Sequence, residues 1–159
     1  MRNLLQGRGS LVAKLALLCL LALTLLPSGC SQGGTLECEI HYKYVTGMKG
    51  PLYFIIVTNQ PSDSQPSIVF DSTAEEEIKA ALPSAGNLVV DDSSATLIET
   101  FYTNVFYTVS IHVMSGNDYK YYQSCRTSRE IFNELTMGAR MKVETEPSDV
   151  GPKIVRIMD

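Results

Sequence analysis

The chain has 159 residues, of which 45% are hydrophobic and 19% are charged, a composition typical of one globular domain. Four cysteines are too few for a disulfide-dense miniprotein, and no extended low-complexity tract indicates wholesale disorder. The net charge of −4 is unevenly distributed: beyond residue 30 the chain has 10 basic and 17 acidic residues, a net charge of −7, so we expect no nucleic acid partner.

The first thirty residues have the parts of a secretory signal peptide. Their only charged side chains are three cations before residue 15, and an apolar run follows from Leu15 to Leu26. This run is too short to cross a bilayer, which takes about 20 apolar residues. Residues 1–29 are therefore predicted to direct export and to be removed.

The segment Leu26-Pro27-Ser28-Gly29-Cys30 resembles the lipobox of bacterial lipoproteins, in which a small residue precedes a cysteine that is lipidated and becomes the mature N-terminus. Ser28 and Gly29 match that pattern, whereas Pro27 stands where the family has leucine or another aliphatic residue. The resemblance, which covers only residues 1–30, implies a lipid on Cys30 and a membrane as the first partner. By resemblance to enterobacterial lipoproteins, Ser31 in place of aspartate after the cysteine implies sorting to the outer membrane.

Residues 30–35 then form a flexible Gly/Ser tether, and residues 36–159 form a single β-rich domain. The alternative is cleavage by the ordinary signal peptidase near residues 28–31, which yields a soluble secreted protein.

Two cysteines remain in the mature domain, Cys38 and Cys125. Exported thiols enter an oxidising compartment, so we predict that these two form a disulfide. The alternative is a pair of free thiols buried as small hydrophobic side chains.

The mature chain opens with a predicted hairpin. From Leu36 the residues alternate between two faces, with one face formed by Cys38, Ile40, Tyr42 and Tyr44. The other face is formed by Glu37, Glu39, His41 and Lys43. Residues 46–51 have the composition of a turn, and residues 52–58 are rich in β-branched and aromatic side chains, as in a second strand.

A first short helix is predicted over about 72–82. Residues 72–75 match a capping box, and the acidic run 75–77 lies at the positive end of the helix dipole. The alternation then resumes over 101–114 and, with 95–99 before it, exceeds the usual strand length, so we expect a bulge or bend near Thr103-Asn104. A hairpin turn at 115–118 leads into a strand over 119–125.

A second short helix is predicted over about 128–137, where residues 127–130 match a capping box and Gly138 is the terminator. Two alternating strands follow, over 140–145 and 153–158. The sum is a β-rich α+β domain, with a mainly antiparallel sheet or partly open barrel of six to eight strands and two short helices. The loop ending at Gly138 and the closing strands resemble the last helix and hairpin of small OB-like barrels.

The sequence holds no nucleotide, zinc-protease or serine-hydrolase motif, and we expect no cofactor, no metal and no catalytic residue. The spacing of Glu37, Glu39 and His41 could hold a metal ion, but it is ordinary for the solvated face of a strand. His112 has no nucleophile or orienting acid that the sequence identifies, so we interpret it as a sheet-surface histidine.

Tyrosine is the compositional exception, because all eight lie in the mature chain and three of them, Tyr119, Tyr121 and Tyr122, share one predicted strand. Tyrosine is favoured at recognition surfaces, and we expect these residues to contribute to a partner-binding surface. Cross-strand packing is the alternative.

The expected function is therefore that of a membrane-anchored lipoprotein, exported to the periplasm or the cell surface. It acts there as a non-catalytic binding or envelope-assembly module for an envelope protein or a small ligand. A soluble secreted inhibitor or ligand carrier and an envelope enzyme with a dispersed site are the alternatives.

Overall fold

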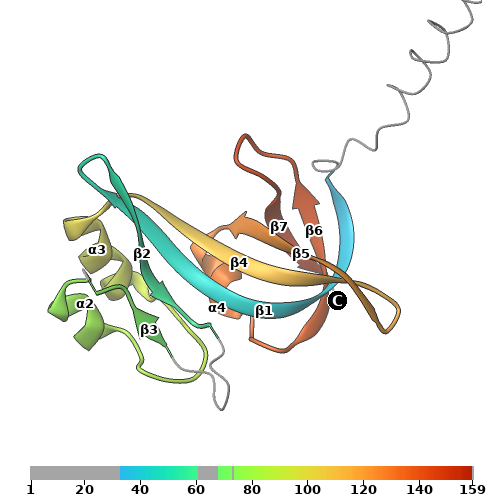
Figure 1. The fold of residues 1–159 in the computed structure, drawn as a ribbon, viewed down its shortest axis with the longest axis horizontal. Helices are drawn as coiled ribbons and strands as arrows, with labels where there is room; N and C mark the ends of the chain where they lie inside the picture. The colour runs from blue at the N-terminus through green and yellow to red at the C-terminus, as the bar shows by residue number, and fades with distance from the viewer. Residues whose placement is uncertain (1–32, 61–67, 73, 159) are drawn as a thin grey trace, which may run out of the picture. The chain divides into compact units, whose positions relative to one another are not determined.

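The computed structural model describes residues 33–60, 68–72 and 74–158, and the expectations for the signal peptide and for Cys30 lie outside these residues. The described chain forms a β-rich structure with three short helices (Figure 1). The strands are β1 (Gly34–Lys49), β2 (Leu52–Thr58), β3 (Val69–Phe70), β4 (Thr103–Ser115), β5 (Asp118–Thr127), β6 (Arg140–Glu146) and β7 (Lys153–Met158). The helices are α2 (Glu76–Ala81), α3 (Asp92–Phe101) and α4 (Arg129–Glu134).

All strands belong to one sheet, in the order β3-β2-β1-β4-β5-β7-β6. Because β6 also pairs with β1, the five strands from β1 to β6 in this order close into a barrel. Every neighbouring pair is antiparallel except β5 and β7, which run parallel. The β-rich α+β class is thus confirmed, and the strand order, with α4 between the third and fourth barrel strands, is that of an OB-like barrel.

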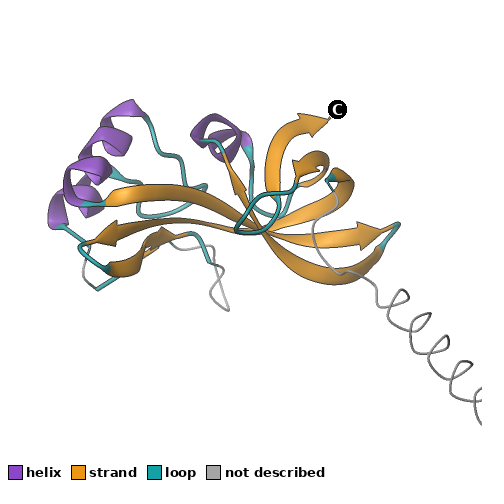
Figure 2. Cartoon of the chain, turned by 90° about the horizontal axis from the view of Figure 1, so that it is seen from above, coloured by secondary structure: helices purple, strands orange, loops and turns teal. Residues whose placement is uncertain are grey.

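The elements β2, β3, α2 and α3 are inserted between the first two barrel strands. β1 and β4 extend beyond the barrel to hold this insertion, since the far end of β1 pairs with β2 from Tyr44↔Thr58 to Lys49↔Leu52. Figure 2 shows the two helices of the insertion grouped at one end of the sheet, with α4 apart from them. At its other end β1 begins at Gly34, which pairs with Thr145 of β6, so the strand includes two residues that we expected in the tether.

A β-bulge in β1 changes which side chains face inward. Ile40 pairs with Ile111 and Tyr42 with Ser110, so His41 is an extra residue on β1. The alternation shifts by one beyond this point. The predicted faces are therefore wrong after the bulge: Tyr42 and Tyr44 lie on the outer face, whereas Lys43 is completely buried.

The helices differ from the prediction in number and in their starting points. α2 begins only at Glu76, and its N-cap Glu75 makes no side-chain cap hydrogen bond, so the predicted capping box is wrong. The segment 95–99, expected as strand, lies within α3, whose N-cap Asp91 accepts a hydrogen bond from the backbone N–H of Ser94. The expected irregularity at 103–104 is present, because Asn104 has φ 49° where α3 gives way to β4.

In the last third of the chain the predicted elements are present, but the bounds of the helix differ. The N-cap of α4 is Ser128, which accepts a hydrogen bond from the N–H of Ile131, so the predicted capping box over 127–130 is wrong by one residue. The helix ends at Glu134 with Leu135 as its C-cap, and the expected terminator Gly138 has φ 73° in the loop that leads to β6. The two closing strands pair as an antiparallel hairpin.

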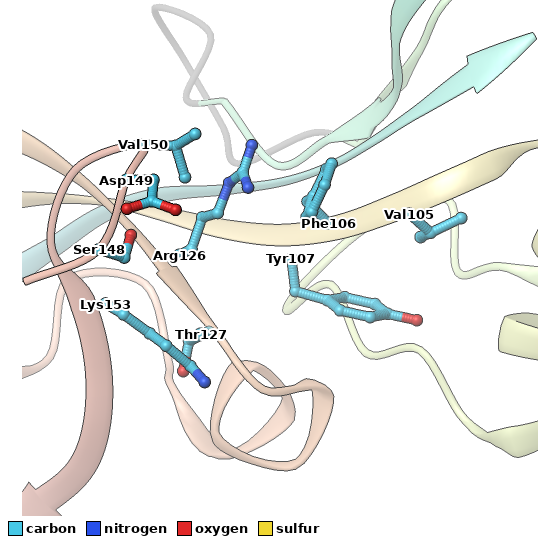
Figure 3. A pocket seen from close by; sticks show the side chains of 9 residues that line it. All are labelled: Val105, Phe106, Tyr107, Arg126, Thr127, Ser148, Asp149, Val150 and Lys153. Carbon is cyan, nitrogen blue, oxygen red and sulfur yellow. The ribbon is translucent and has the colours of Figure 1, made fainter. Parts of the chain in front are cut away.

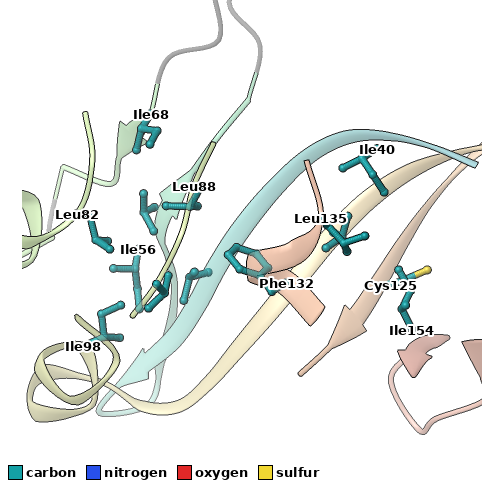
Figure 4. Close-up of a cluster of buried hydrophobic side chains, with 14 of the residues drawn as sticks. Ile40, Ile56, Ile68, Leu82, Leu88, Ile98, Cys125, Phe132, Leu135 and Ile154 are labelled. Carbon is teal, nitrogen blue, oxygen red and sulfur yellow. The ribbon is translucent and has the colours of Figure 1, made fainter. Parts of the chain in front are cut away.

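One hydrophobic cluster runs from the barrel into the insertion (Figure 4). Cys125, Ile154 and Leu135 fill the barrel end, and Ile56, Leu88 and Ile98 fill the insertion. Among the described residues, no helix has the length and hydrophobicity needed to cross a membrane.

Candidate functional site

The tyrosines predicted to form a partner surface are all exposed, by 55% for Tyr119, 50% for Tyr121 and 64% for Tyr122. They do not share one face. Tyr121 pairs with the inward-facing Val113, whereas Tyr119 and Tyr122 both contact the ring of His112, with centroids 4.7 and 3.7 Å away. Lys120 is an extra residue on β5, because its neighbours Tyr121 and Tyr119 pair with the consecutive residues Val113 and Met114 of β4. This register shift places Tyr119 and Tyr122 together on the outer face of β5.

The two histidines of the chain, His41 and His112, lie next to each other on this outer face. Their rings stack with centroids 4.5 Å apart, and Tyr122 contacts both. Burial lowers the pKa of His41, as does the neighbouring His112, while the carboxylate of Glu39 raises it. Both ring nitrogens of His112 are buried and have no hydrogen-bond partner in the described structure.

Glu39, which the sequence placed in a candidate metal pattern, is engaged by other side chains. Its Oε2 accepts hydrogen bonds from Tyr119 Oη and Arg140 Nε, each at 3.1 Å. Within the described ranges, no three His, Cys, Asp or Glu side chains are grouped so that they could hold a metal ion.

Cys38 and Cys125 lie on barrel strands and are fully buried. They are free thiols in this structure, and burial raises the pKa of Cys38 to about 11 and that of Cys125 to about 12, the latter with a contribution from Cys38. The disulfide stays a prediction.

A cavity of about 420 Å³ lies where β4 extends past the end of β5 (Figure 3). Its walls come from β4, the end of β5, the loop between β6 and β7, and the start of β7. The lining residues are Val105, Phe106, Tyr107, Arg126, Thr127, Ser148, Asp149, Val150 and Lys153. This volume is within the range of small-ligand sites. A smaller cavity of about 180 Å³, lined partly by Tyr44 and Tyr53, shares Arg126 and Val150 with it.

Sequence reasoning missed this site. Its cations lie on the short parallel pairing of β5 with β7, where Arg126 is opposite Lys153, and a parallel pairing of distant strands has no local sequence signature. The one available signal was Arg126 itself, a charged residue at an outward position next to Cys125.

Searches of protein-family models, of curated proteins and of solved structures each found no match to this chain.

Proposed function

We propose that this protein is an exported bacterial lipoprotein, anchored by a lipid on Cys30, whose barrel domain acts as a non-catalytic binding module of the cell envelope. The cationic start, the short apolar run and the Ser28-Gly29-Cys30 sequence support the anchor. The binding role rests on the cavity at Arg126 and on the aromatic outer face that carries Tyr119 and Tyr122.

The cavity carries this proposal because it combines apolar walls with cationic side chains. Phe106, Val105 and Val150 supply the apolar surface, and Arg126 and Lys153 supply donors. Ligand sites have this combination, in which apolar area gives affinity and a few polar groups fix orientation. In OB-like barrels the face of the second and third strands binds ligands, which adds support by fold-level analogy.

The anchor is tested by comparing the full chain with a Cys30→Ser variant in a bacterial host. We expect the wild-type protein to incorporate labelled palmitate and to partition into the detergent phase. The variant does neither. If the wild-type protein stays in the aqueous phase and takes up no label, the soluble secreted alternative replaces the anchored one.

The binding role is tested by photo-crosslinking in intact cells. A benzophenone amino acid replaces Tyr122 on the aromatic face or, as a control, the exposed Glu77 of α2. We expect a discrete envelope-protein adduct from position 122 and none from position 77. Identical adduct patterns from both positions would contradict a partner surface at Tyr122.

A further inference from the structure

Arg126 differs from the other three arginines of the described residues because its charge is unpaired. Its guanidinium carbon lies 3.6 Å from the centroid of the Phe106 ring, and no ion pair or side-chain hydrogen bond is recorded for it in the described structure. Five other cations each pair with a carboxylate; they are Lys49, Lys79, Arg129, Arg140 and Arg156. The Phe106 ring covers one face of the guanidinium and leaves its edge N–H groups available as donors.

The walls of the larger cavity have a charge opposite to that of the domain. Arg126 and Lys153 contribute two positive charges and Asp149 one negative charge, whereas residues beyond 30 sum to −7. Figure 3 shows Arg126 extending toward Phe106 and Lys153 extending toward Thr127, so the two cations border the cavity on different sides. A ligand with a single negative charge would neutralise this lining, whereas a dianion would leave excess charge in an acidic protein.

The loop between β6 and β7, which lines one side of the cavity, is held in place by backbone contacts. The N–H of Arg126 donates to the carbonyl of Pro152, and Ser148 and Gly151 exchange backbone hydrogen bonds. Val150 at the tip is 59% exposed and lines both cavities. An apolar side chain is thereby placed opposite the guanidinium without a covering partner in the described chain.

We propose that this cavity binds a small organic carboxylate that carries one negative charge and a planar or aliphatic apolar part. The guanidinium edge of Arg126 takes the carboxylate in a bidentate pair, and the apolar part lies against Phe106 and Val150. Because Arg126 borders both cavities, the apolar part has a second direction to extend, toward Tyr44 and Tyr53. This inference rests on the proposed binding function and names the chemistry of its ligand.

The test uses the full-length protein in lipid nanodiscs and three probes. These are 3-phenylpropionate, its uncharged isostere 3-phenylpropanamide, and inorganic phosphate. Amide chemical shifts of the ¹⁵N-labelled protein report both affinity and location. We expect saturable shifts with the acid, confined to 105–107, 126–127 and 148–153, and binding of the amide that is weaker by about tenfold or more.

Variants distinguish a specific contact with the Arg126 guanidinium from a general effect of positive charge on ligand affinity. Arg126→Gln is expected to weaken binding of the acid by about tenfold while leaving binding of the amide unchanged. Lys120→Gln, which removes an exposed cation outside the cavity, leaves both unchanged. If Arg126→Gln does not fold, Lys153→Gln serves instead, with an expected weakening of about two- to threefold because an exposed lysine contributes less.

Equal affinity for acid and amide, unchanged binding in the folded arginine variant, or stronger binding of phosphate than of the acid would each overturn the proposal. If carboxylate binding fails but position 122 still crosslinks to an envelope protein, the proposed binding function stands without this ligand. If carboxylate binding and crosslinking both fail, the proposed binding function is refuted as well.

Discussion

Replacing the buried Lys43 by methionine is expected to change how the stability of the protein depends on pH. Lys43 is fully buried, and its Nζ donates to the carbonyl of Leu135 at 2.9 Å and lies 4.4 Å from the centroid of the Phe132 ring. No carboxylate pairs with it in the described structure. Burial therefore lowers the pKa of Lys43 from 10.5 to about 7.

The sign follows from proton linkage. Between about pH 7 and pH 10.5 the unfolded chain holds a proton on Lys43 that the folded chain has released, so the free energy of unfolding rises with pH. The slope approaches about 1.4 kcal/mol per pH unit, and the gain from pH 7 to pH 9 is about 2 kcal/mol. Below pH 7 the cost of burying the charge is fully present, and above pH 10.5 it is gone.

Few other groups interfere in this window. The lowered pKa of His41 affects stability below its usual value of 6.5, and the raised pKa of Tyr107 acts above 10. The raised pKa values of Cys38 and Cys125 oppose the gain only near the upper end of the window, at about pH 9, if these thiols are free. Urea unfolding followed by circular dichroism at pH 7, 8 and 9 measures the slope. We expect the free energy of unfolding to rise with pH in the wild-type protein and in Lys142→Met, a control at an exposed lysine. We expect no such rise in Lys43→Met. A flat wild-type profile, or a slope that survives in Lys43→Met, would refute the reasoning.

Two further predictions concern the thiols and a close backbone approach. If Cys38 and Cys125 are free, their raised pKa values mean that the unfolded chain loses protons first above pH 9, so stability falls there by up to about 1.4 kcal/mol per pH unit for each thiol. Oxidised protein lacks this fall if the predicted disulfide forms, and mass spectrometry with and without reductant counts the thiols. Gly47→Ala is expected to destabilise by about 1–3 kcal/mol in urea unfolding, because the added Cβ would lie 2.9 Å from Cβ of Tyr102. Gly34→Ala, whose Cβ meets nothing within 4 Å, is the matched control, and equal effects would contradict a packing cause.

Local signals in the sequence predict much of the fold. Period-two alternation locates β1, β4 and the closing strands, and the turns at 50–51 and 116–117 fall where glycine and polar residues predict them. The missed α3 has a local explanation: the β-branched Thr96 and Ile98 also suit a strand, and the N-cap Asp91 was the signal that distinguishes the two.

Other features have no local signal. The bulge at His41 depends on pairing with β4, about 70 residues away in sequence, and it reverses the faces of Tyr42, Lys43 and Tyr44. The cavity depends on the parallel pairing of Arg126 with Lys153. Strand pairing between distant segments thus determines both the buried lysine and the candidate site.

Closure of the barrel sets the order in which the chain can fold. The hydroxyl of Thr145 donates to the carbonyl of Gly34 across 111 residues of sequence, and the first barrel strand finds this partner only after most of the chain is available. Under the proposed export, a chain that emerges N-terminus first exposes Cys38 until its strand partners arrive. The proposal therefore implies that the thiol state of the protein depends on whether barrel closure or oxidation in that compartment is faster.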